Sequence, residues 1–149
     1  MTLPIAYLLD TNVVSEMMRP NPMSEVAEFL DAAAKEGIGL ATITVWEILD
    51  GIGRLPADRR RRHLAEQFQG VLSQVFEERI LGWTLADAQA CACLMEEKRR
   101  KGESLDDHLP DAMLAGTALH RDLTVVTRNE REFRNTGVKT INPWEQTTL

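Results

Sequence analysis

The sequence predicts an α/β fold with a central, mostly parallel sheet flanked by helices. Short apolar runs typical of buried strands alternate along the chain with longer segments of helical periodicity. Strands that are joined through helices pair in parallel, which is the second observation behind this class. The chain has 149 residues, of which 44% are hydrophobic, and we expect residues 1–149 to form a single domain with its own core.

The predicted strands are short apolar runs bounded by polar residues or glycine. The first run, residues 5–9, ends directly at the carboxylate of Asp10. This is the pattern of a buried strand that stops at the edge of a sheet. The expected strands cover residues 5–9, 38–43, 79–83, 123–127 and 139–142.

The predicted helices are marked by capping residues and by apolar positions at helical spacing. Thr44 with Glu47, and Thr84 with Asp87, match a capping box, in which two side chains satisfy free N–H groups of the first turn. Pro110 fits the first turn of a helix, where its missing N–H costs nothing. The expected helices cover residues 13–18, 24–35, a segment from 44 onward, 57–75 as a helical hairpin or arm, 84–100, 110–120 and 130–134.

Charge and hydropathy narrow the function classes. No apolar run approaches the roughly 20 residues that span a bilayer, and the N-terminus lacks a signal-peptide pattern, so we expect a cytoplasmic protein with no membrane partner. The net charge of −6 is unusual for a protein that binds nucleic acid, although basic residues are grouped at 59–62, 98–101 and 128–134. Bound divalent cations would offset the acidic charge if several carboxylates share one site.

The two cysteines, Cys91 and Cys93, are two residues apart in a predicted helix, so their side chains point away from each other. We therefore expect neither a disulfide nor a zinc site. We interpret both as small hydrophobic residues on or near a packed face.

Acidic and amide side chains follow several predicted strands. Asp10 comes directly after the first strand, Glu47 lies just beyond the second, and Asp111 lies in the first turn of a helix. Asn129 and Glu132 follow the strand at 123–127. In open parallel sheets the functional crevice forms at the carboxyl ends of the strands, so these groups are expected to converge there. Oxygen ligands without His or Cys favour Mg²⁺ or Mn²⁺ over zinc.

Each of these residues also has a structural interpretation. Glu47 fits the capping box with Thr44, and the helix dipole favours Asp111 in a first turn whether or not it binds anything. Glu132 fits an exposed surface, whereas Asp10, directly after a buried strand, would be costly without a partner. We interpret the histidines as surface or capping residues, and the tryptophans as core or interface residues: His63, His108, His120, Trp46, Trp83 and Trp144.

Residues 8–16, Leu-Leu-Asp-Thr-Asn-Val-Val-Ser-Glu, resemble the opening motif of the VapC-type PIN-domain toxins, in particular of their FitB-like branch. Further segments are similar to later motifs of that family, in the same order, and together they cover essentially the whole chain. These segments are 42–47 with Gly51, 54–56 followed by arginines, 110–115, 127–133 and 142–144.

The resemblance implies a PIN-like, three-layer α/β/α domain that hydrolyses RNA phosphodiester bonds with a divalent metal, Mg²⁺ or Mn²⁺, and without a protein nucleophile. By this resemblance Asp10, Glu47 and Asp111 hold the catalytic metal, and Asp10 and Asp111 are the direct ligands. Many PIN domains have Asp where this chain has Asn129, so Asn129 or Glu132 is left as the fourth ligand, and we expect one metal in the absence of substrate. Thr11, Asn12 and Thr127 are expected to orient a ligand carboxylate or a water.

The resemblance also implies partners. Toxins of this type act in type II toxin–antitoxin systems, so a cognate antitoxin of the VapB or FitA kind is expected, together with RNA as substrate. A homodimer and a hetero-oligomer with the antitoxin are expected, with DNA bound only through the antitoxin.

Two other functions fit part of the pattern. A phosphatase with an aspartyl nucleophile would also place Asp10 after the first strand, but that chemistry normally uses a second carboxylate two positions later, where this chain has Asn12. A non-catalytic PIN-like binding module would keep the fold without turnover, and the intact Asp10, Glu47 and Asp111 count against it.

Overall fold

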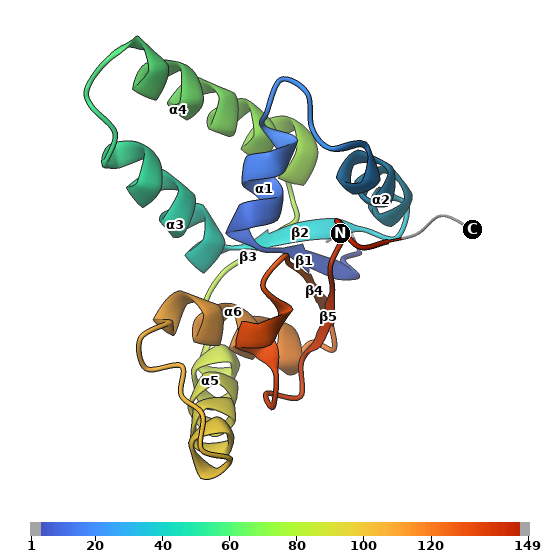
Figure 1. The fold of residues 1–149 in the computed structure, drawn as a ribbon, viewed down its shortest axis with the longest axis vertical. Coiled ribbons are helices and arrows are strands. Elements are labelled where there is room, and N and C mark those ends of the chain that lie inside the picture. Colours follow the sequence, from blue (N-terminus) through green and yellow to red (C-terminus); the bar gives the residue numbers. More distant parts are fainter. Residues whose placement is uncertain (1–3, 147–149) are drawn as a thin grey trace.

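A computed structural model describes residues 4–146 and contains a five-stranded parallel sheet in the order β3-β2-β1-β4-β5 (Figure 1). The central strand β1 pairs with β2 on one side, with Tyr7 opposite Ile38, and with β4 on the other, with Tyr7 opposite Thr124. The predicted α/β class with a parallel sheet is confirmed. The strands are β1 (Tyr7–Leu9), β2 (Ile38–Ala41), β3 (Ile80–Leu81), β4 (Thr124–Val126) and β5 (Lys139–Ile141).

Helices cover both faces of the sheet and give three layers (Figure 1). The helices α1 to α4 lie on one side, and α5 and α6 lie on the other, with α3 and α4 forming an extended helical hairpin. The helices are α1 (Thr11–Met17), α2 (Ser24–Ala34), α3 (Thr42–Gly53), α4 (Arg59–Val71), α5 (Leu85–Arg100) and α6 (Leu109–Leu119); a π-helical turn (Leu72–Phe76) extends α4, and a 3₁₀ turn, η2 (Glu130–Phe133), follows β4.

The hydrophobic residues form two cores, one on each face of the sheet. Leu9 and Val126 belong to the core under α1 to α4, whereas their neighbours Leu8 and Val125 belong to the core under α5 and α6. Successive side chains of a strand point to opposite faces. Both members of each pair are therefore fully buried, which explains why these strands are continuous apolar runs rather than alternating ones.

The predicted capping box at Thr44 is wrong. Helix α3 begins at Thr42, directly after the buried strand β2, and its N-cap residue is Ala41. Thr44 lies inside the first turn, and its buried hydroxyl has no hydrogen-bond partner within residues 4–146. Glu47 is consequently not a capping residue, and its carboxylate is available for other contacts.

The other boundaries agree with the prediction or differ from it by up to four residues. Helix α1 begins at Thr11, two residues earlier than predicted, because Asp10 caps it through the Thr11 N–H. Helix α4 begins after Asp58, whose side chain accepts a hydrogen bond from the Arg61 N–H. The capping box of Thr84 and Asp87 at the start of α5 is confirmed.

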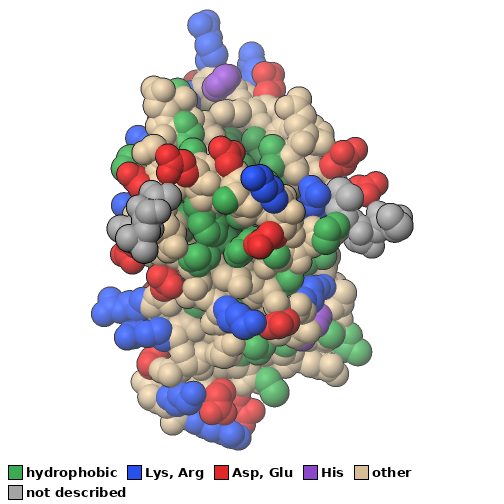
Figure 2. All heavy atoms as spheres, turned by 90° about the vertical axis from the view of Figure 1, so that its right-hand side faces the viewer, with side chains coloured by type: hydrophobic (Ala, Val, Ile, Leu, Met, Phe, Trp, Pro, Cys, Tyr) green, Lys and Arg blue, Asp and Glu red, His purple; other side chains and the backbone are tan. Residues whose placement is uncertain are grey.

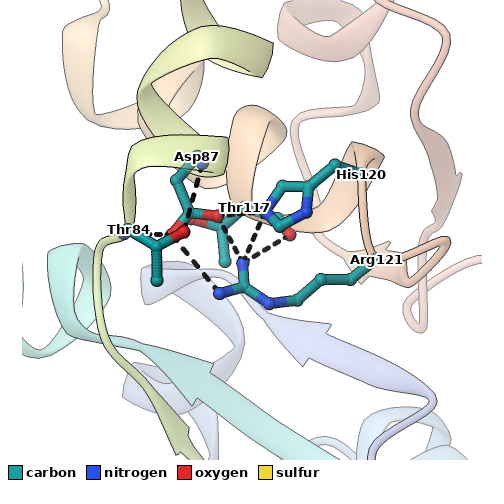
Figure 3. Close-up of polar contacts among 5 residues, drawn as sticks. All are labelled: Thr84, Asp87, Thr117, His120 and Arg121. Atoms are coloured by element: carbon teal, nitrogen blue, oxygen red, sulfur yellow. Dashed lines mark hydrogen bonds and ion pairs between the residues drawn. The ribbon is translucent and has the colours of Figure 1, made fainter.

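A buried ionic cluster joins the beginning of α5 to the end of α6 (Figure 3). Asp87 is fully buried and accepts hydrogen bonds from the Thr84 N–H at 2.7 Å, from Arg121 and from the His120 ring. Arg121 also donates to the Thr117 carbonyl at 2.9 Å. Burial opposes ionisation of Asp87, but the hydrogen bonds from Arg121, His120 and the Thr84 N–H, with the Arg121 charge, hold its pKa below the ordinary value.

The same two helices approach closely at Gly116. A Cβ atom there would lie 2.9 Å from the Asp87 carbonyl oxygen and 2.9 Å from the Cys91 backbone nitrogen. Only glycine allows this separation. The contact and the Asp87 cluster together fix α6 against α5, and so fix the N-terminal end of α6 where Asp111 lies.

Cys91 is buried in this packed face, as expected, whereas Cys93 is exposed, and both are free thiols. Within residues 4–146, no helix has both the length and the apolar character needed to cross a membrane.

Candidate metal centre

Asp10 lies at the junction of β1 and α1 and is only 4% exposed. Its Oδ1 accepts the Thr11 N–H at 2.8 Å, and its Oδ2 accepts the Thr127 hydroxyl at 2.8 Å and the Asn12 amide at 3.4 Å. Burial raises the pKa of Asp10, and these three hydrogen bonds only partly offset the increase. All the donors are neutral, so the negative charge of Asp10 has no cationic partner within residues 4–146.

Glu47 lies in the second turn of α3, and its Oε1 accepts the Thr11 hydroxyl at 3.0 Å. Thr11 therefore binds two carboxylates, Asp10 through its backbone and Glu47 through its side chain. Burial raises the pKa of Glu47, the Thr11 hydrogen bond lowers it, and the charge of Asp10 raises it further. The two carboxylates thus share one electrostatic environment.

Asp111 lies in the first turn of α6 and joins this environment from the opposite layer. Burial raises its pKa to about 7, with further increases from the charges of Asp10, Glu47 and Glu132, against a small decrease from His108. A carboxyl group with this pKa is half protonated at neutral pH. The structure therefore brings together Asp10, Glu47 and Asp111, which are far apart along the chain, at the carboxyl ends of β1 and β2.

The two alternatives for a fourth ligand lie differently. Glu132, on η2, is partly buried, with 27% of its side chain exposed, and its charge raises the pKa of Asp111. Asn129 is exposed, and its backbone N–H donates to the Thr127 hydroxyl at 3.0 Å. Glu132 is thus the fourth carboxylate of one acidic cluster, which consists of Asp10, Glu47, Asp111 and Glu132.

The polar residues next to Asp10 hold it in one orientation. The Thr127 hydroxyl donates to Asp10 and accepts from the Asn129 N–H. Asn12 donates to Asp10 and accepts the Arg128 N–H at 3.1 Å. Asn12, at the position where a phosphatase would have a second carboxylate, is instead a neutral donor to Asp10.

His108 was not singled out as a site residue from the sequence, yet it faces the acidic cluster. It precedes α6, makes no side-chain capping hydrogen bond, and lies 3.8 Å from both Asp111 and Glu132. The available signal was its position three residues before Asp111, which places both side chains on one side of a helix start.

A cavity of about 730 Å³ begins beside the acidic cluster and runs between α1, α3 and α4. Its walls include Thr11 and Glu47 at one end, and further along they are mainly apolar, with Met18, Ile52 and Leu64. This groove is wide enough to hold a chain segment or part of a ligand.

The basic groups divide into paired and unpaired ones. Figure 2 shows Lys and Arg side chains at both ends of the long axis, near the α3–α4 loop and near the end of α5. Those at the end of α5 lie among acidic residues, with Arg99 bound to Asp106 and Arg100 to Glu96. Arg128, by contrast, has no carboxylate partner within residues 4–146; its backbone N–H donates to Asn12, and its guanidinium lies 4.8 Å from the centre of the Trp144 ring.

Comparison with known proteins identifies the family of this chain. The family model for the PIN domain matches residues 7–139. The chain belongs to the PIN-domain family. This PIN domain is 38% identical to the plasmid stability protein StbB of Pseudomonas syringae pv. tomato over 93% of the chain and 98% of that protein. It is 32% identical to the VapC ribonuclease Y4jK of Sinorhizobium fredii, over 93% of the chain and 97% of that protein, and 33% identical to the toxin FitB of Neisseria gonorrhoeae, over 92% and 97%.

The fold agrees as well. The solved structure of FitAB bound to the IR36 DNA fragment superposes on this PIN domain with a TM-score of 0.85, at 31% identity, over 95% of this chain and 98% of that one. The resemblance to the FitB-like branch of the VapC-type toxins is thereby confirmed, together with the three-layer fold.

Proposed function

We propose that this PIN domain is a metal-dependent endoribonuclease and the toxin component of a type II toxin–antitoxin system. The observation that carries the proposal is the acidic cluster of Asp10, Glu47, Asp111 and Glu132, which is partly or fully buried and has no Lys or Arg partner within residues 4–146. Buried carboxylates that repel one another are costly unless a cation binds them. The similarity to a VapC ribonuclease and to the toxin FitB supports the reaction class.

The donor set fits Mg²⁺ or Mn²⁺, because carboxylate oxygens are the ligands that these hard cations prefer. Asp10 and Asp111 would be direct ligands, and Glu47 and Glu132 would complete the site directly or through water. When bound, the metal supplies a Lewis acid that assists hydrolysis of a phosphodiester.

The residues of this chain prepare the site in two ways. Thr127, Thr11 and Asn12 hold Asp10 in one orientation through three hydrogen bonds, so little reorganisation is needed on binding. Asp111, whose pKa is about 7, gives up its remaining proton when the cluster takes up a cation.

RNA is the proposed substrate, and Arg128 is the proposed contact for its backbone. Arg128 is exposed, lies next to Asp10 through Asn12, and has no carboxylate partner within residues 4–146. A guanidinium binds phosphate oxygens with matched geometry.

The proposed partner is a cognate antitoxin of the VapB or FitA kind, which would occupy the groove between α1, α3 and α4. The groove has mainly apolar walls and includes the Glu47 carboxylate, which suits a segment that carries both apolar side chains and an arginine. DNA would be bound only through the antitoxin; the solved structure of FitAB with a DNA fragment supports a complex that can bind DNA. Exposed Trp46 and Leu49 on α3 support a homodimer.

The decisive experiment is to incubate the purified protein with end-labelled single-stranded RNA in the presence of EDTA, Mg²⁺ or Mn²⁺. Cleavage is expected with either metal and none with EDTA. Asp10→Asn, checked by circular dichroism for an intact fold, is expected to be inactive. Equal cleavage with EDTA, or full activity of the Asp10→Asn protein, would contradict the proposal.

A further inference from the structure

His108 lies between two carboxylates of the acidic cluster. Its Nδ1 is 3.8 Å from Asp111 Oδ2, and its Nε2 is 3.8 Å from Glu132 Oε2. Both separations are too long for hydrogen bonds. The imidazole is therefore oriented toward these carboxylates without being bonded to either, and half of its surface is open to solvent.

The three side chains offer donor atoms close enough to share one ion. One ligand atom from each of His108, Asp111 and Glu132 lies within 4.8 Å of the other two. Two ligands of one ion, with bonds of about 2.1 Å, lie at most ~4.2 Å apart. The exposed His108 ring and the partly exposed Glu132 side chain would have to move closer together to bind one ion.

Of the three histidines, His108 is the one that faces this cluster closely. His120 is bound to Asp87 at the opposite end of α6. His63, on α4, lines the groove that also contains Glu47, but it is not part of the group formed by His108, Asp111 and Glu132. The negative charges that surround His108 come from Asp111 on its own helix, from Glu132 on η2, and from Asp10 and Glu47 behind Asp111.

We propose that His108 supplies a nitrogen ligand to the divalent ion held by Asp111 and Glu132, and that this nitrogen makes the site prefer Mn²⁺ to Mg²⁺. The inference rests on the proposed metal dependence and deepens it. Imidazole binds first-row transition ions well, whereas Mg²⁺ prefers oxygen ligands and keeps its waters. A site built only of carboxylates would show this preference more weakly.

The test measures metal binding directly and does not depend on cleavage. Mn²⁺ binding to the metal-free protein is followed by electron paramagnetic resonance, and Mg²⁺ binding is measured by competition against Mn²⁺. A nitrogen bound directly to Mn²⁺ is detected by electron spin-echo modulation from ¹⁴N. The proteins are the wild type, His108→Ala, and His63→Ala as a control for loss of an exposed imidazole elsewhere.

The wild type is expected to show ¹⁴N modulation from bound Mn²⁺. His108→Ala should lose this signal and bind Mn²⁺ about tenfold more weakly or worse, while its Mg²⁺ affinity changes by less than about threefold. His63→Ala should match the wild type.

Two results would overturn the inference in different ways. In the first, His108→Ala keeps the ¹⁴N signal and binds Mn²⁺ and Mg²⁺ with the same affinity ratio as the wild type. This result would show that His108 is not a ligand and would leave the proposed nuclease activity unaffected. Failure of the wild type to bind either ion would contradict the proposed metal dependence itself.

Discussion

Asp87 and Asp111 are both carboxylates held near one helix, α6, but their surroundings are opposite. Asp87 is fully buried against Arg121 and His120, and its pKa is held below the ordinary value (Figure 3). Asp111, at the other end of α6, is surrounded by further carboxylates, and burial with their repulsion raises its pKa to about 7. Burial alone therefore does not indicate a functional site in this protein. A buried carboxylate that lacks a compensating cation does indicate one.

The carboxylates of Asp87 and Asp111 also have opposite effects on the free energy of unfolding. The ionised form of Asp87 is favoured by folding, so it stabilises the protein, whereas the ionised form of Asp111 is disfavoured. The Asp87 cluster and the close contact at Gly116 hold α6 in place. They offset the free-energy cost of the carboxylates that repel one another at the N-terminal end of the same helix. Asp87 is thus the structural carboxylate of this pair, and Asp111 is the functional one.

The largest effect is expected for Asp10→Asn, measured as RNA cleavage. The amide keeps the shape of the side chain but removes the charge needed for a cation, so cleavage should be lost. The fold should remain intact, because the amide oxygen can accept the Thr11 N–H while the amide nitrogen can donate to the Thr127 hydroxyl. A purified variant with normal activity would place the chemistry elsewhere.

Asp87→Ala should produce the largest loss of stability. Removing one member of a buried ion pair leaves the others unpaired, and here it also removes a helix cap, so urea denaturation should show a loss of about 3 kcal/mol. Glu96→Ala, in the same helix but in an exposed pair with Arg100, should change stability by no more than about 0.5 kcal/mol. Similar losses in both variants would mean that the Asp87 cluster is not a structural centre.

The Asp87 contribution also has a defined pH dependence. Because its folded pKa lies below the unfolded value near 3.8, this stabilisation is present above about pH 4 and is lost as the pH falls through the folded pKa. Stability of the wild type should fall in this acid range more steeply than that of Asp87→Ala.

Asp111→Asn should stabilise the metal-free protein while abolishing cleavage. The folded state holds a proton on Asp111 up to about pH 7, whereas the unfolded state releases it near pH 3.8. Wild-type stability should therefore decrease between these values, and the variant should lack this decrease, with a gain at pH 8 on the order of 2 kcal/mol. Thermal unfolding from pH 4 to pH 8 measures the difference, and identical pH profiles for the two proteins would be inconsistent with it.

Thr127→Val should weaken metal binding with little effect on the fold. The Thr127 hydroxyl donates to Asp10, and its loss should raise the Asp10 pKa further and lower Mn²⁺ affinity by about tenfold. Thr124→Val, at the opposite end of β4, is the matched control and should bind as the wild type does. Equal affinities of both variants in calorimetry would show that Thr127 does not position Asp10.

The smallest effect is expected for Arg128→Ala, measured as RNA binding by the inactive Asp10→Asn protein. Loss of one phosphate contact should lower the slope of log affinity against log salt by about 0.7. Arg131→Ala, an exposed arginine on η2, should keep the wild-type slope. An unchanged slope for Arg128→Ala would place the RNA elsewhere on the surface.

The order of strands and helices was predictable because it depends on local patterns. Buried strands of three to four residues give continuous apolar runs, and Thr84 with Asp87 gives a true capping box. Thr44 shows the limit of such patterns, because the same spacing to Glu47 occurs inside a helix that begins earlier. Whether a strand leads directly into a helix is decided by packing, which spacing alone does not encode.

The acidic cluster was predictable only in part. Asp10 follows a strand, and its need for a partner could be inferred from the sequence, but its hydrogen bond to Thr127 spans 117 positions. The pairing of Asp87 with Arg121 and the approach of His108 to Glu132 likewise depend on α5, α6 and η2 meeting in space. The sequence therefore identified candidate ligands but not which of them lie without a cationic partner.

The most direct test of the central claim is an NMR titration of the aspartate carboxyl carbons in the metal-free protein, with Asp111→Asn and Asp87→Asn used for assignment. The acidic cluster is expected to release a proton near pH 7, seen at Asp111, while Asp87 stays ionised to below pH 3.8. An Asp111 signal that titrates near pH 4, as an ordinary carboxyl group does, would contradict it.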